Sequence, residues 1–95
     1  MERRKLTDAE VTRALSALPG WSLKDGKLHK LFTFPDFLRA FGFMAQVALV
    51  AQAMDHHPDW SNVYNRVTID LVTHDLGGIS TFYIELARQM ESLLT

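Results

Sequence analysis

Three of the four histidines in the chain lie between residues 56 and 74. His56 and His57 are adjacent, and His74 follows after one further segment with a strand-like pattern. Imidazole titrates near neutral pH, so one ring can donate a proton while another accepts one. We therefore interpret the three histidines as one site for acid/base chemistry, of the kind that a metal-free elimination of water requires.

A metal centre is the alternative interpretation of these residues. Neutral imidazoles suit Zn²⁺, Fe²⁺ or Ni²⁺, and Asp55, Asp59 or Asp75 could add a carboxylate ligand. However, adjacent histidines seldom bind one ion together, and the His-Glu-x-x-His spacing of helical zinc sites is absent. The chain also lacks cysteine and a Gly-x-Ser-x-Gly elbow, which excludes thiolate chemistry and disfavours a serine nucleophile. The pattern favours a site that holds no metal.

Pro58 determines how the adjacent histidines can share one site. Proline cannot continue a helix, and it biases His57 toward an extended backbone. Adjacent side chains on regular structure point apart, but a break between helix and strand allows both rings to line one cavity. We expect His56 near a helix end, and His74 at the end of the next strand, where it can reach over the rim of the sheet.

The first part of the chain predicts a helix followed by a hairpin. Thr7 and Glu10 form a capping box, and Pro19-Gly20 ends the helix that the box begins. Asp25-Gly26 then favours a two-residue turn between a short strand at 21–24 and a second strand at 27–34.

A long helix is predicted from Pro35-Asp36 to about Met54. It is apolar over most of its circumference, so we expect it to pack against the sheet, against other helices and against another subunit. Gln52 falls among apolar residues, where a polar group needs a partner. It either bonds to backbone near the helix end or lines a site.

The second part of the chain predicts another hairpin and a last helix. Strands are expected at 60–64 and 67–74, with a turn at Asn65-Arg66, and Ser80 is a suitable N-cap for the last helix. The core face of the second of these strands consists of Val67, Ile69, Leu71 and Thr73.

These elements follow one another in the order α-β-β-α-β-β-α. They predict a two-layer α+β fold, in which a four-stranded antiparallel sheet carries three helices on one face. We expect a single domain over residues 1–95, with residues 1–6 as a flexible tail that includes the charged run Glu2-Arg3-Arg4-Lys5. His29 is interpreted as a half-exposed sheet residue without a role.

Composition restricts the classes of function. The net charge is −1, and the basic residues do not cluster, which argues against nucleic-acid binding. The N-terminus lacks the apolar core of a signal peptide, and Arg39 and Gln46 interrupt the longest apolar run, so we expect no membrane span. The expected location is the cytoplasm.

Several motifs together resemble the pterin-4a-carbinolamine dehydratase family. They are Asp55-His56-His57-Pro58-Asp59-Trp60, Asn62-Val63-Tyr64-Asn65, Thr73-His74-Asp75 and Gly78-Ile79-Ser80. The helix residues Phe37 to Leu49 and the position of Trp21 after the first helix are also similar to that family. The resemblance covers roughly residues 7 to 94.

The resemblance implies a lyase that needs no cofactor. It would convert 4a-hydroxytetrahydropterin, the product of aromatic amino acid hydroxylases, to quinonoid dihydropterin and water. The active-site histidines would be His56, His57 and His74, with His56 and His74 transferring protons and His57 holding the pterin. The resemblance also implies substrate contacts from Asp55, the Thr73 backbone, Asp75 and Trp21.

The sequence departs from the family pattern at two positions. Familiar members carry a glutamate where this chain has Gln52 and an aspartate where it has Tyr83, and both residues are expected to lie close behind the site. Their loss implies a slower enzyme, another pterin, or pterin binding without turnover. A further alternative is an interaction module, since some family members act as dimerisation cofactors. A homodimer or homotetramer is expected in either case.

Overall fold

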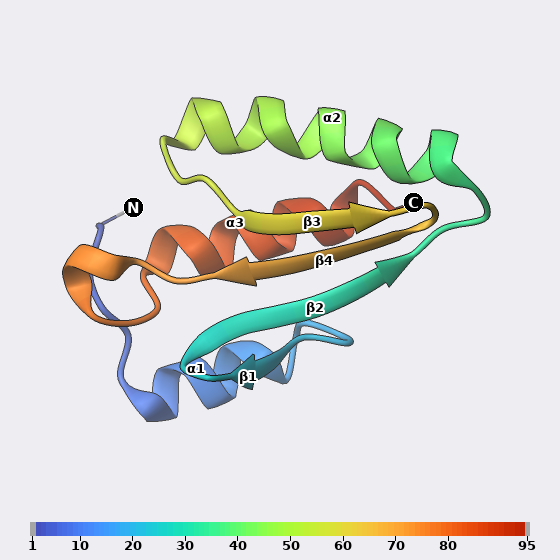
Figure 1. Ribbon diagram of the computed structural model, residues 1–95. Helices are drawn as coiled ribbons and strands as arrows, with labels where there is room; N and C mark the ends of the chain where they lie inside the picture. The colour runs from blue at the N-terminus through green and yellow to red at the C-terminus, as the bar shows by residue number, and fades with distance from the viewer. Residues whose placement is uncertain (1, 95) are drawn as a thin grey trace.

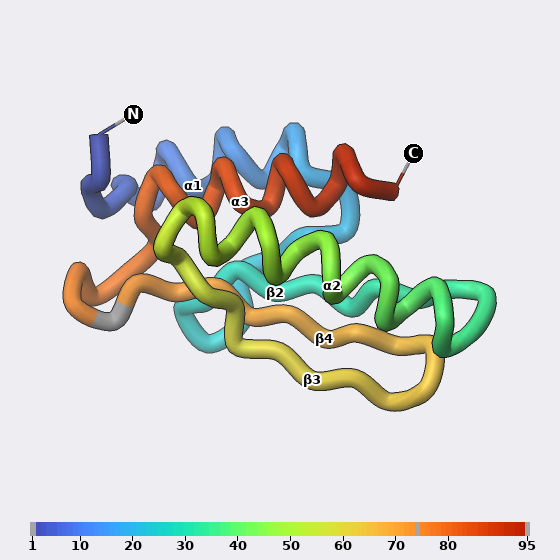
Figure 2. The backbone as a smooth tube through the Cα atoms, turned by 90° about the horizontal axis from the view of Figure 1, so that it is seen from above, coloured from blue at the N-terminus to red at the C-terminus, as the bar shows by residue number. Residues whose placement is uncertain are grey.

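The computed structural model describes residues 2–94, with the side chain of His74 outside the description. The helices and strands are α1 (Asp8–Leu15), β1 (Ser22–Lys24), β2 (Lys27–Thr33), α2 (Phe37–Met54), β3 (Asp59–Val63), β4 (Arg66–Leu71), the short 3-10 helix η1 (His74–Leu76) and α3 (Thr81–Ser92). The four strands form one antiparallel sheet in the order β1-β2-β4-β3 (Figure 1). All three α-helices lie on the same face of the sheet (Figure 2). The predicted α+β fold is therefore confirmed.

The core lies between the sheet and the helices. The two central strands turn alternate side chains toward the helices, as a half-buried sheet requires. The residues of the sheet that are almost fully buried are Leu28, Phe32, Val67, Ile69 and Leu71. From the helices, Ala40, Phe43, Val47 and Ala51 of α2 and Tyr83, Ile84, Leu86, Ala87 and Met90 of α3 pack against them. The core face predicted for β4 is confirmed.

Local sequence signals explain most of the element boundaries. Thr7 and Glu10 make the predicted capping box at the start of α1. Asp36 caps α2 by accepting from the Arg39 amide at 2.8 Å. In the first hairpin Asp25 and Gly26 both have positive φ, 53° and 77°, as a type I′ turn demands.

The second hairpin turns one residue earlier than predicted. The turn is Tyr64-Asn65 rather than Asn65-Arg66, because Arg66 already pairs with Val63 in the ladder. Tyr64 takes the left-handed conformation, with φ 50°. The Asn62 side chain stabilises the turn by donating to the carbonyls of Tyr64 and Arg66, at 3.1 and 2.9 Å.

The strand predicted at 67–74 is too long. β4 ends at Leu71, which is the last residue paired with β2, and Asp70 is the last residue paired with β3. Pro58, the residue before β3, has no N–H group and therefore cannot extend the pairing between β3 and β4. His74 consequently begins the 3-10 helix η1 instead of ending a strand. Its side chain lies outside the described residues.

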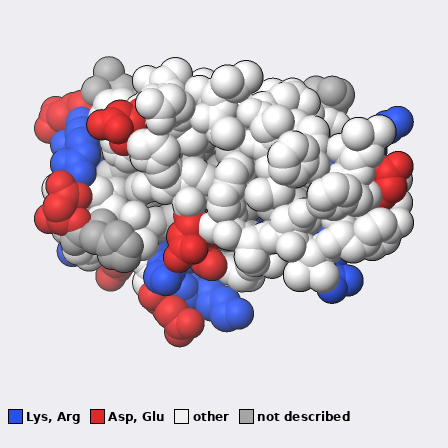
Figure 3. Space-filling view, turned by 45° about the horizontal axis from the view of Figure 1, so that its top comes forward, with Lys and Arg blue, Asp and Glu red and all other residues white. Residues whose placement is uncertain are grey.

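The outer side of α2 is apolar and uncovered in the single chain. Leu38 and Leu49 are each 75% exposed, and Phe37 and Phe41 are also exposed. Figure 3 shows this side of the molecule as a broad surface almost free of Lys, Arg, Asp and Glu. By length and mean hydropathy (1.4) α2 could cross a membrane, but Phe43, Val47 and their neighbours pack it against the domain core. The length and hydropathy of α2 are therefore only weak evidence for a membrane span.

The N-terminal segment lies along the residues that precede α3. The Leu6 amide donates to the Ile79 carbonyl at 2.9 Å, and the Thr81 amide donates to the Arg4 carbonyl at 3.1 Å. Lys5 pairs with Ser80 in an isolated antiparallel bridge. We call residues 2–6 the N-terminal strap. The flexibility expected for residues 1–6 stays a prediction.

The capping box makes stability depend on pH. Hydrogen bonding from Arg4 and from the Thr7 backbone lowers the pKa of Glu10 from 4.5 to about 2. A depressed carboxyl pKa stabilises the fold above the unfolded-state pKa, and this contribution disappears as pH falls toward the folded-state value. We expect Glu10→Gln to lower the free energy of unfolding at pH 7, with the difference from wild type disappearing between about pH 4.5 and pH 2. Urea denaturation at a series of pH values tests this, and an equal difference at pH 7 and pH 2.5 would contradict it.

Candidate active site

A tight helix end places the two adjacent histidines. Asp55 has the left-handed conformation (φ 53°, ψ 39°), and its amide donates to the Gln52 carbonyl at 3.2 Å. The His56 amide returns to the Ala51 carbonyl at 3.0 Å. These two bonds form the Schellman motif, in which Asp55 stands where glycine is usual. The chain thus leaves α2 abruptly, and Pro58 starts the extended segment into β3.

His56 is buried and held on three sides. Its Nδ1 lies 2.8 Å from the Met54 carbonyl oxygen, which can only accept, so Nδ1 carries a proton and donates. The ring stacks on Phe82 at 4.8 Å and 21°, and meets the edge of Tyr83 at 5.1 Å and 77°. Nε2 is therefore the nitrogen that remains available for proton transfer.

His57 is exposed and has the opposite tautomer. Its Nε2 lies 2.9 Å from Gln52 Oε1, an acceptor, so Nε2 carries the proton and Nδ1 is free when the ring is neutral. Gln52 is thus the orienting partner of His57. The Tyr83 hydroxyl of α3 donates to the His57 carbonyl at 2.8 Å. This bond holds the backbone of the segment between α2 and β3.

Tyr83 contributes a neutral group to the site. Burial raises the pKa of the Tyr83 phenol above its ordinary value of 10, and the Asp75 charge acts in the same direction. Tyr83 therefore stays protonated near neutral pH and acts as a hydrogen-bond donor. Gln52 and Tyr83 thus both contact His57 as neutral groups.

An open pocket of about 670 Å³ lies over these side chains. Its lining residues come from the N-terminal strap, the end of α2, the segment after β4 and the first turn of α3. They are Arg3, Met54, Asp55, His56, His57, Val72, Thr73, Asp75, Phe82 and Tyr83. The structure therefore brings together five residues expected at the site: Asp55, His56, His57, Thr73 and Asp75.

Thr73 enters the pocket with an unused hydroxyl. Its amide donates to the Gly78 carbonyl at 2.8 Å, and its own carbonyl accepts from Leu76 and Gly78. Its backbone is therefore occupied by the loop around η1. Its Oγ1 is buried and has no hydrogen-bond partner in the described part of the chain. Because buried polar groups are normally paired, the hydroxyl is better placed than the backbone to gain a bond from a ligand.

Asp75 forms an ion pair with the N-terminal strap. Arg3 Nη2 lies 2.6 and 2.8 Å from the two carboxylate oxygens. This hydrogen bond and the charge of Arg3 lower the pKa of Asp75. Among its described residues, the pocket therefore combines two carboxyl groups, those of Asp55 and Asp75, with one guanidinium and two imidazoles.

Trp21, which was expected at the site, and the family-like motif at 62–65 both lie elsewhere. Trp21 packs edge-on against Phe32, and its Nε1 donates to Glu91 at 2.9 Å. Glu91 lies eight residues beyond Tyr83 on α3, roughly 12 Å along the helix axis. The stretch from Asn62 to Asn65 shapes the β3–β4 turn at the far end of the hairpin, and Asn65 donates to the Phe34 carbonyl. Neither part lines the pocket.

Sequence reasoning missed Arg3 and Phe82. Arg3 falls within a charged run that resembles a solvated tail, and its partner lies 72 residues away. No local pattern could have paired them. Phe82 could have been predicted from the sequence. It is a large apolar residue in the first turn of the last helix, and it adjoins Tyr83, which was expected close behind the site.

The geometry does not supply a metal centre from the described side chains. Within that part of the chain, no three His, Cys, Asp or Glu side chains gather closely enough to hold an ion. The His74 side chain lies outside the described residues, so the expected absence of a metal stays a prediction.

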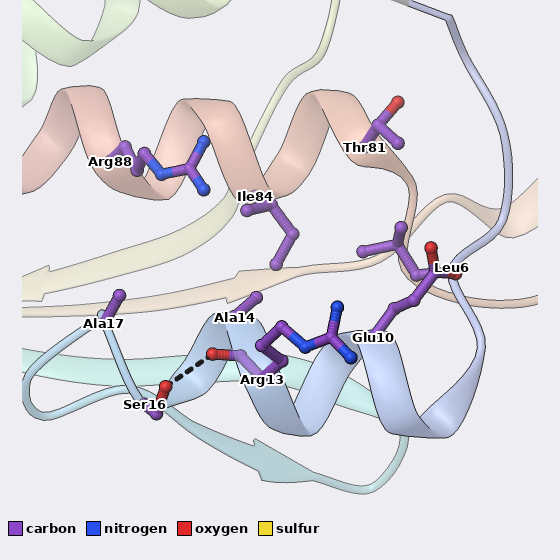
Figure 4. A pocket seen from close by; sticks show the side chains of 9 residues that line it. All are labelled: Leu6, Glu10, Arg13, Ala14, Ser16, Ala17, Thr81, Ile84 and Arg88. Atoms are coloured by element: carbon purple, nitrogen blue, oxygen red, sulfur yellow. Dashed lines mark hydrogen bonds between the residues drawn. The ribbon is translucent and has the colours of Figure 1, made fainter.

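A second cavity, of about 560 Å³, lies between α1 and α3 (Figure 4). Ala14 and Ile84 face one another across it, and Arg13 and Arg88 flank it. Its one carboxylate, Glu10, is committed to Arg4 at 2.7 and 2.9 Å. It contains no histidine, so the pocket over His56 and His57 is the candidate active site.

Comparison with known proteins agrees with this assignment. The family model for pterin 4 alpha carbinolamine dehydratase matches residues 4–93. A protein of Solibacter usitatus, named provisionally as a pterin-4-alpha-carbinolamine dehydratase, is 51% identical over 89 residues, covering 94% of each chain. A provisionally named dehydratase of Brucella ovis is 47% identical and covers 98% of both chains.

A solved structure extends the similarity to three dimensions. The crystal structure of a protein described as a transcriptional coactivator/pterin dehydratase, from Brucella melitensis, superposes with a TM-score of 0.89 at 47% identity. It covers 94% of this chain and 97% of its own. The residues 4–93 that the family model matches include the capping box, the sheet, all three helices and the histidine pair, and the chain therefore belongs to the pterin-4a-carbinolamine dehydratase family.

Proposed function

We propose that the protein converts 4a-hydroxytetrahydropterin to quinonoid dihydropterin and water, and so recycles the pterin used by aromatic amino acid hydroxylases. The observation that carries this proposal is that the imidazoles of His56 and His57 line one pocket, each with one ring nitrogen bonded to a protein acceptor and the other without a partner among the described residues. Family membership supports the substrate class. The proposed reaction needs no cofactor, and we place the protein in the cytoplasm.

The proposed reaction requires one acid and one base. The bond between C4a and the hydroxyl oxygen breaks as the N5 lone pair forms a C4a–N5 double bond, and a donated proton lets the oxygen leave as water. A second group then accepts a proton from the pterin ring. We assign the proton transfers to His56 and His74 and the holding of the pterin to His57, whose orientation depends on Gln52.

We assign recognition of the polar edge of the pterin to Asp75 and Thr73, which also line the pocket. Asp75 would accept from the ring N–H groups, and Thr73 would contribute its unpaired hydroxyl. Asp55 already serves as the left-handed end residue of α2, and any contact of its carboxylate with substrate would be additional. Trp21 belongs to the hydrophobic core and donates to Glu91, so it has no part in the pocket of its own chain in this arrangement.

The exposed surface of α2 supports a self-associated protein. Leu38, Phe41 and Leu49 would be covered by a second copy in a homodimer or homotetramer, because monomeric proteins seldom leave large contiguous apolar patches in water. The same surface favours a second candidate function, a protein-interaction module. The structurally similar Brucella melitensis protein is described as both a coactivator and a dehydratase.

Stopped-flow measurement of 4a-hydroxytetrahydropterin dehydration tests the catalytic proposal. General acid/base groups contribute roughly 10²- to 10⁴-fold, so His56→Ala and His74→Ala should each lower the rate enhancement by about a hundredfold or more. His29→Ala is the matched control, because His29 pairs with Asp70 on the open face of the sheet. Tight pterin binding by wild type without faster dehydration would instead support a binding protein.

Gln52→Glu tests the neutral partner of His57. A carboxylate 2.9 Å from the ring would stabilise its protonated form more than the amide does. We expect the alkaline limb of the pH–rate profile to move to higher pH. Gln46→Glu adds the same charge to an exposed position of α2 and should leave the profile unchanged. Equal profiles for all three proteins would show that the Gln52–His57 bond does not tune the reaction.

Light scattering after gel filtration tests the α2 surface. Leu49→Glu should lower the molar mass of the assembly at least twofold, since it introduces a charge into the apolar patch. Leu31→Glu, on the open face of the sheet and 50% exposed, should leave the mass unchanged. A monomeric wild-type protein at micromolar concentration would contradict self-association.

A further inference from the structure

We propose that Arg3 is a substrate-binding residue, and that the Arg3–Asp75 pair recognises the 2-amino-4-oxo edge of the pterin as one unit. This inference rests on the proposed function and adds a specificity-determining residue to it. Arg3 comes from the N-terminal strap, and the residues matched by the family model begin only after it, at residue 4.

The strap fixes Arg3 at the pocket mouth from both sides. Thr81 bonds to the Glu2 carbonyl through its side chain and to the Arg4 carbonyl through its amide. Beyond Arg4, Leu6 is bonded to Ile79. The main chain on either side of Arg3 is therefore attached to the segment that leads into α3, and the guanidinium reaches Asp75 from a defined position.

Contact geometry leaves hydrogen-bonding capacity on both partners. A single nitrogen, Nη2, contacts both oxygens of Asp75. Within the described residues, Nη1 and Nε of Arg3 make no hydrogen bond, and a carboxylate has about four acceptor sites, of which two are used. The Asp75 side chain remains 70% exposed and the Arg3 side chain 40% exposed. Both residues line the histidine pocket.

The unused groups match the pterin edge in type and order. That edge presents a carbonyl acceptor at C4, followed by N–H donors at N3 and at the 2-amino group. The free acceptor sites of Asp75 suit the two donors, and a free N–H of Arg3 suits the carbonyl. A carboxylate alone would satisfy only the donors, so the arginine makes the site selective for an oxo group at C4.

A purely structural role explains the pair less well. Exposed ion pairs contribute little to stability, and the strap is already attached by backbone bonds and by Arg4 to Glu10. Arg4 is therefore the matched comparison for Arg3. It is adjacent in sequence and carries the same charge, and it contacts a carboxylate equally closely, but it lies at α1 rather than at the pocket.

Calorimetric binding of a dihydropterin and of its 2,4-diamino analogue tests the inference in the full-length protein. Wild type should prefer the oxo ligand. Arg3→Ala should weaken binding of the oxo ligand about tenfold and reduce the preference by a similar factor, because a lost hydrogen bond to a charged group has this size. Arg3→Lys should restore part of the affinity. Arg4→Ala should stay within about twofold of wild type for both ligands.

The outcomes separate this inference from the proposed function. If wild type accelerates dehydration but Arg3→Ala binds both ligands as wild type does, the role of Arg3 is wrong and the function stands. If Arg3→Ala binds more tightly, Arg3 competes with substrate for Asp75, and the inference is also wrong. If the preference falls but wild type does not accelerate dehydration, Arg3 recognises pterin in a protein that is not a dehydratase. Equal losses in Arg3→Ala and Arg4→Ala would indicate only a loosened strap.

Discussion

The left-handed end of α2 is the constraint on which the site depends. Asp55 adopts φ 53° without being glycine, a conformation that costs on the order of 1–2 kcal/mol for an ordinary residue. Two backbone bonds and the packing of His56 against Phe82 offset that cost. Because the chain turns so sharply there, one histidine enters the interior while the next stays at the surface. Pro58 then prevents the helix from continuing and releases the chain into β3.

Local signals were sufficient to predict the fold. Capping residues, the Asp25-Gly26 turn and the alternation along β4 each act within a few residues, and all agree with one two-layer arrangement. The errors arose where a boundary depends on a neighbouring strand. β4 stops because its partners stop, and the second turn moved to Tyr64 because the ladder begins at Arg66.

The residues of the candidate site that are neighbours in the sequence could be predicted, and those brought in by distant contacts could not. The histidine pair and Thr73-His74-Asp75 could be proposed from motifs, and the described members meet in one pocket. The misplacement of Trp21 and the omission of Arg3 have the opposite cause, since each is placed by partners 70 or more residues away. Gln52 and Tyr83 could be singled out from the sequence, but their hydrogen bonds to His57 could not, because these depend on how the end of α2 and the start of α3 pack together.

The strap has a consequence for how the protein is made. Arg3 is synthesised 72 residues before its partner Asp75, and Ile79, which pairs with the strap, follows later still. Contacts between such distant residues are formed late, because a long loop must close before they can contribute. The sheet centre can pair β2 with β4 before α3 exists, but the pocket wall cannot. A nascent chain could therefore hold its core strands together while it still lacks a complete binding site, because the N-terminal strap would join the segment before α3 only late in assembly.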